Sequence, residues 1–402
     1  MTKSKKINEV LTRGVERIIE KEHLKKALAG GKKLRIKHGI DPTGDKIHLG
    51  RATQLWKLKE LQDLGHKIVL IIGDFTAQIG DPSDKPEGRE SLTEKQIKAN
   101  MKSYLEQFSK ILNIKKAEIR YNSEWFKKLS LQEFLGLAGT FSVQQLVQRR
   151  NFKERWNKKE PISLKEICYP LLQGYDSVMV KADVELGGYD QLFNLKTGRN
   201  IQRLFDQKPQ DIIALKMLYG LDGRKMATSW GNVVNIVDPP NEIYGKLMSM
   251  KDELIADYFE LCTPASQEEL KKTKKELKGK TINPRDLKAK LAFQIVCLYH
   301  GKAAAQKAEK EFNKVFKDKG VPSEIRVFFA PKNSYPLVEL LFHLGLAKSK
   351  SDAKRLTEQG GVKISSKVVK DFRKQVKVRE GMIIQVGKRK FARITQNDCR
   401  CE

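Results

Sequence analysis

The sequence has few cysteines and no long apolar run. Its five cysteines among 402 residues are scattered, odd in number and free of any Cys-x-x-Cys pair, which argues against a disulfide framework and a zinc site. No stretch of 18 apolar residues suggests a membrane span. The first 28 residues are charged throughout and lack the apolar core of a signal peptide. No fixed-period repeat is present. We therefore expect a protein of the reducing cytoplasm, without a structural metal and without a membrane partner.

Acidic residues are scarce relative to basic ones. The chain has 78 Lys and Arg residues against 49 Asp and Glu, a formal charge of +29. Such an excess favours a polyanionic partner such as nucleic acid, although lysine-rich solvated helix faces would give the same balance. Since 40% of the residues are hydrophobic, disorder is not expected. The length allows two to four folded domains.

The residues from 34 to 64 have the pattern of a strand, a turn and a helix. Apolar residues alternate with mostly basic ones over 34–40, which predicts a strand, and leucines recur at helical spacing over 49–64. A glycine-bearing turn between a strand and a helix is a common way to build a phosphate site. This turn, however, matches neither the dinucleotide-binding fingerprint nor the Walker loop.

The same alternation continues through the first 240 residues. Further strands are predicted at 67–74, 117–122, 176–184 and 210–218, with a helix over 94–112. Strands that alternate with helices indicate an α/β fold, a doubly wound parallel (Rossmann-like) sheet. From the N-terminus we expect a catalytic domain over 1–240 with a helical insertion near 123–165, an all-helical domain over 241–330, a proline-bearing linker over 321–336 and a small α+β domain over 334–402.

Two short segments carry candidate phosphate chemistry. His48-Leu49-Gly50-Arg51 falls where the first of these helices begins, so that free backbone amides, the helix dipole and an imidazole would face a triphosphate together. The second segment, Lys225-Met226-Ala227-Thr228-Ser229, is a basic, glycine-flanked loop after the last strand. Taken singly, the first fits an ordinary helix cap and the second a solvated loop.

Three other segments carry candidate substrate contacts. Tyr169, Gln173 and Asp176 have the spacing i, i+4, i+7, which places them on one face of a helix. That face is either solvated or directed into a pocket, and the apolar residues around it favour the pocket. The segments GGYDQLFN (187–194) and GDFTAQIGDPSDKPEGR (73–89) are also rich in polar and glycine residues.

Together these motifs resemble class I aminoacyl-tRNA synthetases, whose signatures are H-I-G-H and K-M-S-K-S. The order and the surrounding segments are similar to the longer bacterial form of tyrosyl-tRNA synthetase. The resemblance implies formation of tyrosyl-adenylate from L-tyrosine and ATP, with Mg²⁺ accompanying ATP, and transfer to tRNA(Tyr). It implies catalytic roles for His48, Lys225, Thr43, Lys85, Arg89 and Gln191. It implies ATP contacts from Asp41, His48, Gly50, Arg51, Gly188, Asp190, Lys225, Met226 and Thr228. It implies tyrosine contacts from Thr76, Asp81, Tyr169, Gln173, Asp176 and Lys37.

The segment GLAKSKSDAKRLTEQGGVKI (345–364) of the C-terminal part resembles the alpha-L RNA-binding module. From Ser334 to the end there are 16 Lys and Arg residues against 7 Asp and Glu, a net charge of +9. The resemblance implies that this domain binds tRNA and that the chain forms a homodimer through the inserted region. The candidate RNA-binding residues are Lys348, Lys350, Lys354, Arg355 and Lys363.

The sequence departs from the family pattern at three positions. Arg51 stands where the first signature usually ends in histidine, and Thr228 replaces the second lysine of the second signature. Lys37 occupies the region where many members use a tyrosine to touch the substrate phenol. An RNA-binding protein with an inactive synthetase fold therefore stays an alternative. Tryptophanyl-tRNA synthetase is the nearest rival among enzymes, but Asp176 and the basic C-terminal module favour tyrosine.

Overall fold

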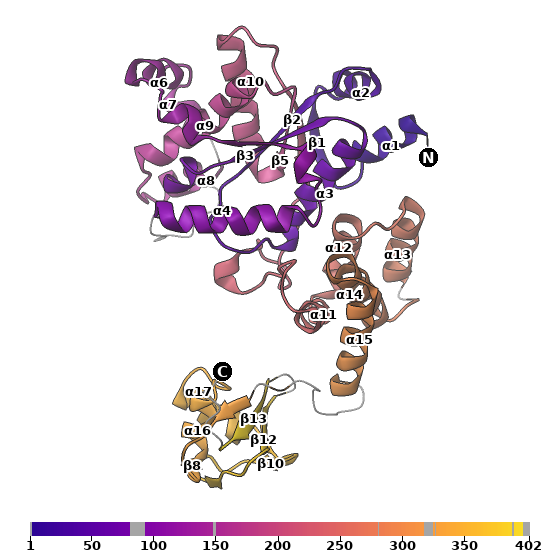
Figure 1. The fold of residues 1–402 in the computed structure, drawn as a ribbon, viewed down its shortest axis with the longest axis vertical. Helices are drawn as coiled ribbons and strands as arrows, with labels where there is room; N and C mark the ends of the chain where they lie inside the picture. The colour runs from indigo at the N-terminus through magenta and orange to yellow at the C-terminus, as the bar shows by residue number, and fades with distance from the viewer. Residues whose placement is uncertain are drawn as a thin grey trace. The chain divides into compact units, whose positions relative to one another are not determined.

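The computed structural model describes residues 2–80, 93–147, 150–279, 281–316, 325, 327–387 and 390–396. The chain divides into two compact units, residues 1–305 and residues 306–402 (Figure 1). Among the described residues, no helix combines the length and the apolarity that crossing a bilayer requires.

A six-stranded sheet organises the first unit, in the order β1-β6-β5-β2-β3-β4. The strands are β1 (Val15–Ile19), β2 (Arg35–Ile40), β3 (Lys67–Ile72), β4 (Glu118–Tyr121), β5 (Val184–Gly188) and β6 (Asp211–Leu215). Five strands run parallel, which confirms the predicted doubly wound sheet. β1 was not predicted, and it pairs antiparallel with β6 at the edge.

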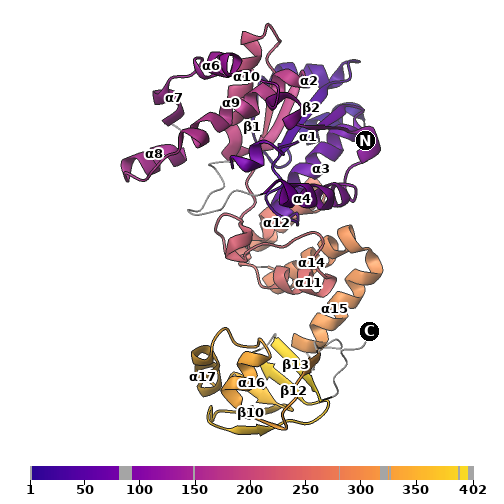
Figure 2. The ribbon, with the colours of Figure 1, turned by 60° about the vertical axis from the view of Figure 1, so that its left-hand side comes forward.

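Helices cover both faces of this sheet. α3 (Leu49–Asp63) and α4 (Glu94–Phe108) lie on one side, and α9 (Leu164–Met179) and α10 (Leu192–Leu204) on the other (Figures 1 and 2). α1 (Lys3–Val10) and α2 (Lys21–Ala29) flank the N-terminal strand β1 in the chain. Because parallel strands end at one edge, the segments that follow β2, β5 and β6 are brought together there.

The strand predicted over residues 176–184 is wrong except at its last residue. Residues 176–179 complete α9, and β5 begins only at Val184. In the run Val-Met-Val, Val178 and Val180 are buried, and Val178 belongs to an apolar cluster with Leu137, Leu171 and Ile201, whereas Met179 is exposed. A short apolar run does not by itself distinguish a buried helix from a strand.

The insertion and the region after residue 240 are helical, as predicted. The insertion contains α5 (Ser123–Phe126), α6 (Leu131–Ala138), α7 (Val143–Val147) and α8 (Arg150–Asn157). The later helices are α11 (Pro240–Met248), α12 (Ile255–Cys262), α13 (Gln267–Gly279), α14 (Pro284–His300) and α15 (Lys302–Phe316). Asn283 caps α14 by accepting from the backbone N–H of Arg285, which confirms the predicted start of this helix.

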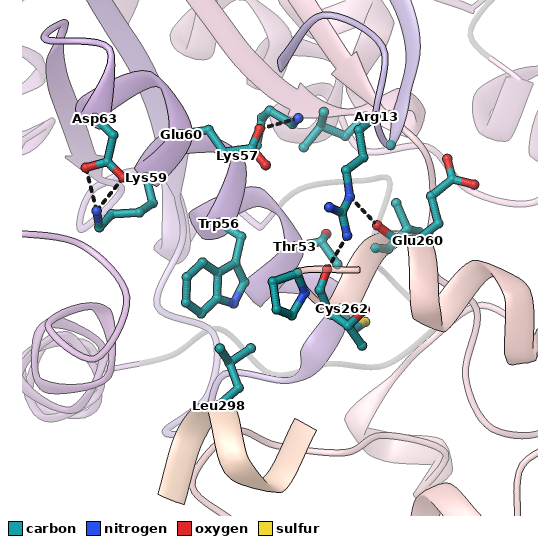
Figure 3. A pocket seen from close by; sticks show the side chains of 15 residues that line it. Arg13, Thr53, Trp56, Lys57, Lys59, Glu60, Asp63, Glu260, Cys262 and Leu298 are labelled. Atoms are coloured by element: carbon teal, nitrogen blue, oxygen red, sulfur yellow. Dashed lines mark hydrogen bonds and ion pairs between the residues drawn. The ribbon is translucent and has the colours of Figure 1, made fainter. Parts of the chain in front are cut away.

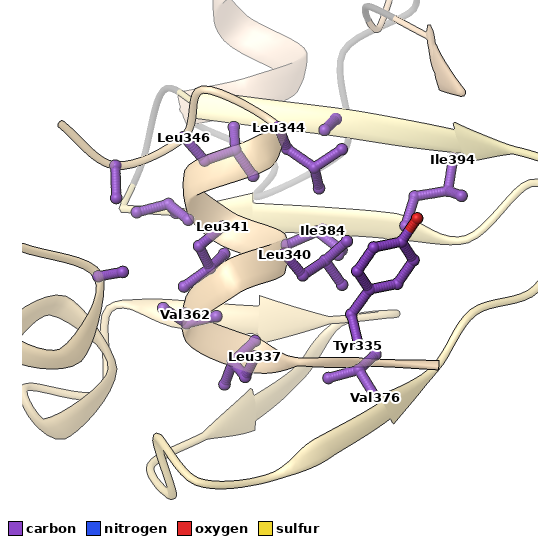
Figure 4. Packing of buried hydrophobic residues seen from close by; sticks show 14 of the residues in the cluster. Tyr335, Leu337, Leu340, Leu341, Leu344, Leu346, Val362, Val376, Ile384 and Ile394 are labelled. Atoms are coloured by element: carbon purple, nitrogen blue, oxygen red, sulfur yellow. The ribbon is translucent and has the colours of Figure 1, made fainter. Parts of the chain in front are cut away.

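The second unit contains a five-stranded sheet in the order β10-β9-β12-β13-β7 and a two-stranded sheet of β11 and β8. Its helices and strands are β7 (Val327–Phe329), β8 (Ser334–Pro336), α16 (Leu337–His343), α17 (Lys350–Glu358), β9 (Val362–Ile364), β10 (Lys367–Val369), β11 (Gln375–Lys377), β12 (Ile383–Val386) and β13 (Lys390–Thr395). α16 packs Leu337, Leu340 and Leu341 into a core that includes Ile384 and Ile394 (Figure 4).

The linker predicted over residues 321–336 is therefore wrong in its second half. β7 pairs parallel with β13, and β8 pairs antiparallel with β11. Each strand has only three residues, and prolines stand beside both. Strands this short carry too little alternation to be recognised before their partners are known.

Candidate active site

The two signature segments meet at Gly50. His48 is the N-cap of α3, and its Nδ1 accepts from the backbone N–H of Arg51 at 3.3 Å. A Cβ atom added to Gly50 would lie 3.1 Å from His48 Nδ1 and 3.2 Å from Met226 Sδ. Gly50 thus lies between the histidine of the first signature and the methionine of the second, and a side chain there would push them apart.

Backbone hydrogen bonds fasten the same junction. The N–H of Leu49 donates to the carbonyl of Val234 at 2.8 Å, and the N–H of Ile236 donates to the carbonyl of Ile47 at 2.9 Å. The chain just after the second signature therefore runs antiparallel beside the start of α3. Both hydrogen bonds join backbone groups, so no pattern of side chains in the sequence could have predicted them.

A third predicted segment joins the junction through an ion pair. Lys225 Nζ lies 3.3 Å from Asp190 Oδ2. Gly188 makes room for this carboxylate, because a Cβ atom there would lie 2.6 Å from Asp190 Oδ1. Segments that follow β2, β5 and β6 are thus brought into one site at the carboxyl edge of the sheet.

Asn232 holds the second signature in place, and sequence reasoning missed it. Its Oδ1 accepts from the backbone N–H of Ala227 at 2.9 Å, and its Nδ2 donates to the carbonyl of Lys225 at 3.0 Å and to Asp222 Oδ1 at 2.9 Å. The hydrogen bond from Asn232 to Asp222, with one from the backbone N–H of Arg224, lowers the pKa of Asp222. Only a side-chain amide both donates and accepts in this way, but an asparagine in a glycine-rich loop looks unremarkable in sequence.

Two other residues of this loop are placed differently from Lys225. Arg224 pairs with Asp222 at 2.6 Å and lies 5.0 Å over the ring of Trp230. Thr228 is exposed and opens a short 3₁₀ turn, Thr228–Trp230. The loop cation that reaches Asp190 is therefore Lys225.

Arg51, the unusual fourth residue of the first signature, is tied to the turn and to α4. Its guanidinium lies 5.7 Å over the ring of Tyr104 and donates to the hydroxyl of that residue. It also donates to Thr43 Oγ1 at 3.0 Å. Thr43 and Arg51, predicted for catalysis and ATP binding, are thus adjacent.

Asp41 is the centre of a polar cluster beneath the turn. It accepts from Thr76 Oγ1 at 2.7 Å and from the hydroxyl of Tyr169 at 2.9 Å. Asn122 in turn donates to Thr76 at 3.0 Å. Gly73 leaves the space, since a Cβ atom there would lie 1.9 Å from Asp41 Oδ1. Asp41, predicted for ATP, is therefore bonded to two residues predicted for tyrosine.

The other two residues of the predicted α9 face have partners of their own. Asp176 is buried and accepts from Trp125 Nε1 at 2.9 Å. Burial raises the pKa of Asp176 to about 7, although the charge of Lys37 and the Trp125 hydrogen bond oppose this rise. Asn194 Nδ2 donates at 2.8 Å both to Gln173 Oε1 and to Gln191 Oε1.

Trp125 and Asn194 were not predicted. Trp125 acts through Asp176 and Asn194 partly through Gln173, both distant in the chain, whereas the Asn194 bond to Gln191 is local and lies within the segment 187–194 already singled out. Lys37 is fully buried and contacts Gln173, Ser177 and Glu185. Three predicted residues, Asp81, Lys85 and Arg89, lie outside the described part of the chain.

A separate cavity of about 300 Å³ lies beside α3, α12 and α14 (Figure 3). Its charged groups are already engaged. Lys57 pairs with Glu60, Lys59 pairs with Asp63, and Arg13 donates to backbone carbonyls. None of the predicted site residues lines it, so we do not assign the catalytic site there.

The candidate RNA-binding residues belong to the second unit. Lys350, Lys354 and Arg355 lie on α17, Lys348 just precedes it, and Lys363 is on β9. Several of these side chains already contact other residues of the second unit. Lys350 pairs with Glu339 at 3.1 Å, Arg355 pairs with Asp352 at 2.6 Å, and Lys354 lies 4.6 Å over the ring of Phe372.

Comparison with known proteins agrees with this geometry. The family described as tRNA synthetases class I (W and Y) matches residues 28–317, and the S4 domain matches residues 336–384. The chain is 44% identical to the tyrosine–tRNA ligase of Thermotoga maritima, over 97% of this chain and 98% of that one. It is 45% identical to the enzyme of that name from Moorella thermoacetica, over 96% and 94%.

A solved structure has the same fold. The tyrosyl-tRNA synthetase of Archaeoglobus fulgidus, determined with L-tyrosine, superposes with a TM-score of 0.63 at 23% identity, over 77% of this chain and 100% of that one. The signatures meet as the fold requires, and the relatives match from end to end. The chain therefore belongs to the class I tRNA synthetases and, within them, to the family of tyrosine–tRNA ligases.

Proposed function

We propose that this chain joins L-tyrosine to tRNA(Tyr) in two steps. Tyrosine and ATP first give tyrosyl-adenylate and pyrophosphate, and the tyrosyl group then passes to the terminal ribose of the tRNA. One observation carries the proposal: Gly50 brings His48 against Met226, while Lys225 reaches Asp190 at the same edge of the sheet. A helix N-terminus and a lysine directed at one point form a site suited to a triphosphate.

The first step needs no protein nucleophile. The tyrosine carboxylate attacks the α-phosphate, so catalysis consists of positioning and of stabilising charge on the phosphates. His48 and Lys225 supply donors to the phosphates, with Thr43 at the turn. Lys85 and Arg89 complete this set. Gln191 holds the carboxylate. The residues that hold the nucleotide are Gly50, Arg51, Gly188, Asp190, Met226 and Thr228.

Tyrosine lies between β2 and α9 in this proposal. Its ammonium meets Thr76 and Tyr169, which form one hydrogen-bonded cluster with Asp41, together with Asp81 and Gln173, and Asp41 stays assigned to ATP. Its phenol donates to Asp176, the buried carboxylate at the far end of the α9 face. A cationic group and a donor hydroxyl at opposite ends of the ligand match acceptors at both ends of the pocket.

Mg²⁺ arrives with ATP in this account. Within the described residues, no three His, Cys, Asp or Glu side chains converge as a metal site. Mg²⁺ commonly keeps several waters and is held by substrate phosphates with few protein ligands, so the phosphates of ATP would supply most of its coordination.

The direct test uses the full chain with ATP, labelled tyrosine and a tRNA(Tyr) transcript. Labelled tRNA is the expected product. An RNA-binding protein with an inactive synthetase fold would bind the transcript and leave it uncharged. A tryptophan enzyme would charge tRNA(Trp) with tryptophan instead.

Different parts of the chain serve different substrates. We assign adenylate formation to residues 1–240 and tRNA binding to the helical domain (241–330) and the basic module (334–402), in the cytoplasm where tRNA is charged. The basic residues act chiefly on phosphate.

Truncation after Phe316 tests this division. Adenylate formation should persist, because every described contact of the candidate site lies before that residue. Charging should fall most at low salt and should depend less steeply on salt than in the full chain, because the lost cations no longer displace counterions from tRNA. Charging assays over a range of salt check this. Normal charging by the truncated chain at every salt concentration would show that the module serves another purpose.

We also propose a homodimer joined through the insertion. Large apolar side chains are exposed along α6 to α9: Leu131, Leu135, Val143, Trp156 and Leu164. Two of them, Leu131 and Leu164, have 73% and 74% of their surface exposed. Several exposed apolar side chains on neighbouring elements are typical of an interaction surface, and a second copy of the chain is the partner that the family resemblance suggests.

Leu135→Asp should convert the dimer to a monomer, because a carboxylate in an apolar interface is costly to desolvate. Sedimentation velocity should find the wild type at twice the chain mass of 46.0 kDa and the variant near one chain mass. The control is Val368→Asp, at an exposed valine of β10 outside the insertion, which should stay dimeric. A monomeric wild type, or a dimeric Leu135→Asp, would contradict the proposal.

A further inference from the structure

A fully buried ion pair joins two neighbouring strands below α9. Lys37 of β2 and Glu185 of β5 are register partners, and Lys37 Nζ lies 2.8 Å from Glu185 Oε1. Their side chains are 0% and 1% exposed. Buried ion pairs add little stability relative to well-packed apolar residues, while the loss of one partner is costly. This pair therefore calls for an explanation other than stability.

The hydrogen-bonding capacity of Lys37 is exhausted inside the protein. An ammonium has three N–H donors. Those of Lys37 are matched by the carbonyl of Gln173 at 2.7 Å, Ser177 Oγ at 2.7 Å and Glu185 Oε1 at 2.8 Å. No donor is left for a substrate phenol, so this geometry gives Lys37 an indirect role instead of the direct tyrosine contact that the family resemblance implied.

Glu185 is equally occupied. Its Oε1 also accepts from Gln173 Nε2 at 3.2 Å, and its Oε2 accepts from Ser177 Oγ at 3.3 Å and from Gln210 Nε2. Gly198 of α10 creates the space for this network. A Cβ atom there would lie 2.6 Å from Gln210 Nε2, 2.9 Å from Ser177 Oγ and 3.2 Å from Glu185 Oε2.

The two α9 residues that contact this ion pair lie on either side of the residue proposed to accept from the substrate phenol. Gln173 and Ser177 are one helical turn apart, and Asp176 lies between them. Lys37 therefore ties the turn of α9 that carries Asp176 to the sheet. Its positive charge also favours the ionised carboxylate of Asp176, the form that accepts from a phenol.

We propose that Lys37 and Glu185 form a buried positioning pair that fixes Gln173 and Asp176 in the tyrosine pocket and so sets selectivity for a phenol without touching the substrate. This inference rests on the proposed tyrosine activation. It assigns a function to Glu185, Ser177 and Gln210 as well as to Lys37.

The test compares Lys37→Met, Lys37→Arg and the double variant Lys37→Met/Glu185→Gln. Pyrophosphate exchange is measured with tyrosine and with phenylalanine, and KM is determined separately for tyrosine and ATP. Lys37→Met should lower the tyrosine-to-phenylalanine ratio of kcat/KM about tenfold or more, with the KM for ATP unchanged. Lys37→Arg should also lower the ratio, because a planar guanidinium does not reproduce the three contacts of an ammonium.

The double variant separates positioning from stability. Removing both charges should restore the thermal midpoint lost in Lys37→Met, because no unpaired charge stays buried, while the selectivity stays low. Lys57→Met is the matched control: it removes a second buried lysine, paired with Glu60 on α3, and should lower the midpoint without changing the ratio.

Three results would overturn the inference. These are a wild-type ratio in every folded Lys37 variant, parallel losses for tyrosine and ATP, or selectivity that returns with stability in the double variant. A wild-type chain without tyrosine-dependent exchange would instead reject the proposed function itself, and the same assay reveals it.

Discussion

Lys225→Met should slow tyrosyl-adenylate formation by about 10²- to 10³-fold, the usual cost of removing one preorganised donor from developing charge. Lys225 is the signature-loop cation that reaches Asp190 at the junction of the three segments. In the proposed mechanism Lys225 contacts the leaving pyrophosphate more strongly as charge builds up, so the loss should fall on kcat more than on the KM for tyrosine. Single-turnover adenylate formation in a quenched-flow instrument measures it.

The neighbouring residue supplies a matched control. Arg224 carries the same charge one position earlier, but it pairs with Asp222 and stacks on Trp230. Arg224→Met should therefore change the rate less than tenfold, as expected for an exposed charge that does not face the reacting phosphates. Equal losses in the two variants would mean that general charge at the loop matters and that the position of Lys225 does not.

Asp176→Ala should reduce kcat/KM for tyrosine by about 10- to 100-fold, because the phenol loses a charged hydrogen-bond acceptor in a buried site. The same change should have little effect on phenylalanine, which has no hydroxyl to pair. Exchange assays with both amino acids give the two values and hence the selectivity.

Destabilisation of the fold and loss of tyrosine recognition can be told apart. Asp176→Ala also removes the acceptor of the Trp125 indole N–H, so the thermal midpoint must be measured together with the kinetics. Asp63→Ala, an exposed carboxylate paired with Lys59 on α3, serves as the control and should behave as wild type. Unchanged tyrosine kinetics in a folded Asp176→Ala variant would remove this residue from the pocket.

Local signals in the sequence predicted much of the scaffold. His48 and Asn283 begin helices as their positions predicted, because capping depends on residues within one turn. The buried parallel strands β2, β3 and β6 were recognisable from continuous or alternating apolar runs, whereas β5 was placed too early in the chain. β1 and β7 were not predicted, because they are short edge strands whose formation depends on pairing with β6 and β13, distant in the chain.

The same distinction between local and long-range signals applies to the residues of the candidate site. Motif residues such as Gly50 and Lys225 could be named from spacing, whereas the groups that position them could not. Asn232 and Trp125 act through hydrogen bonds to Ala227 and Asp176 that only the folded chain brings within reach. The indirect role that we propose for Lys37 was not predictable either, because its three acceptors come from α9 and β5.

ATP–pyrophosphate exchange, run with each of the twenty amino acids in turn, tests the central claim most directly. The claim is that the junction at Gly50, Lys225 and Asp190 activates tyrosine. Exchange should depend on tyrosine, stay near background with the other nineteen, and fall sharply in Lys225→Met. Exchange driven by tryptophan, or none with any amino acid, would contradict it.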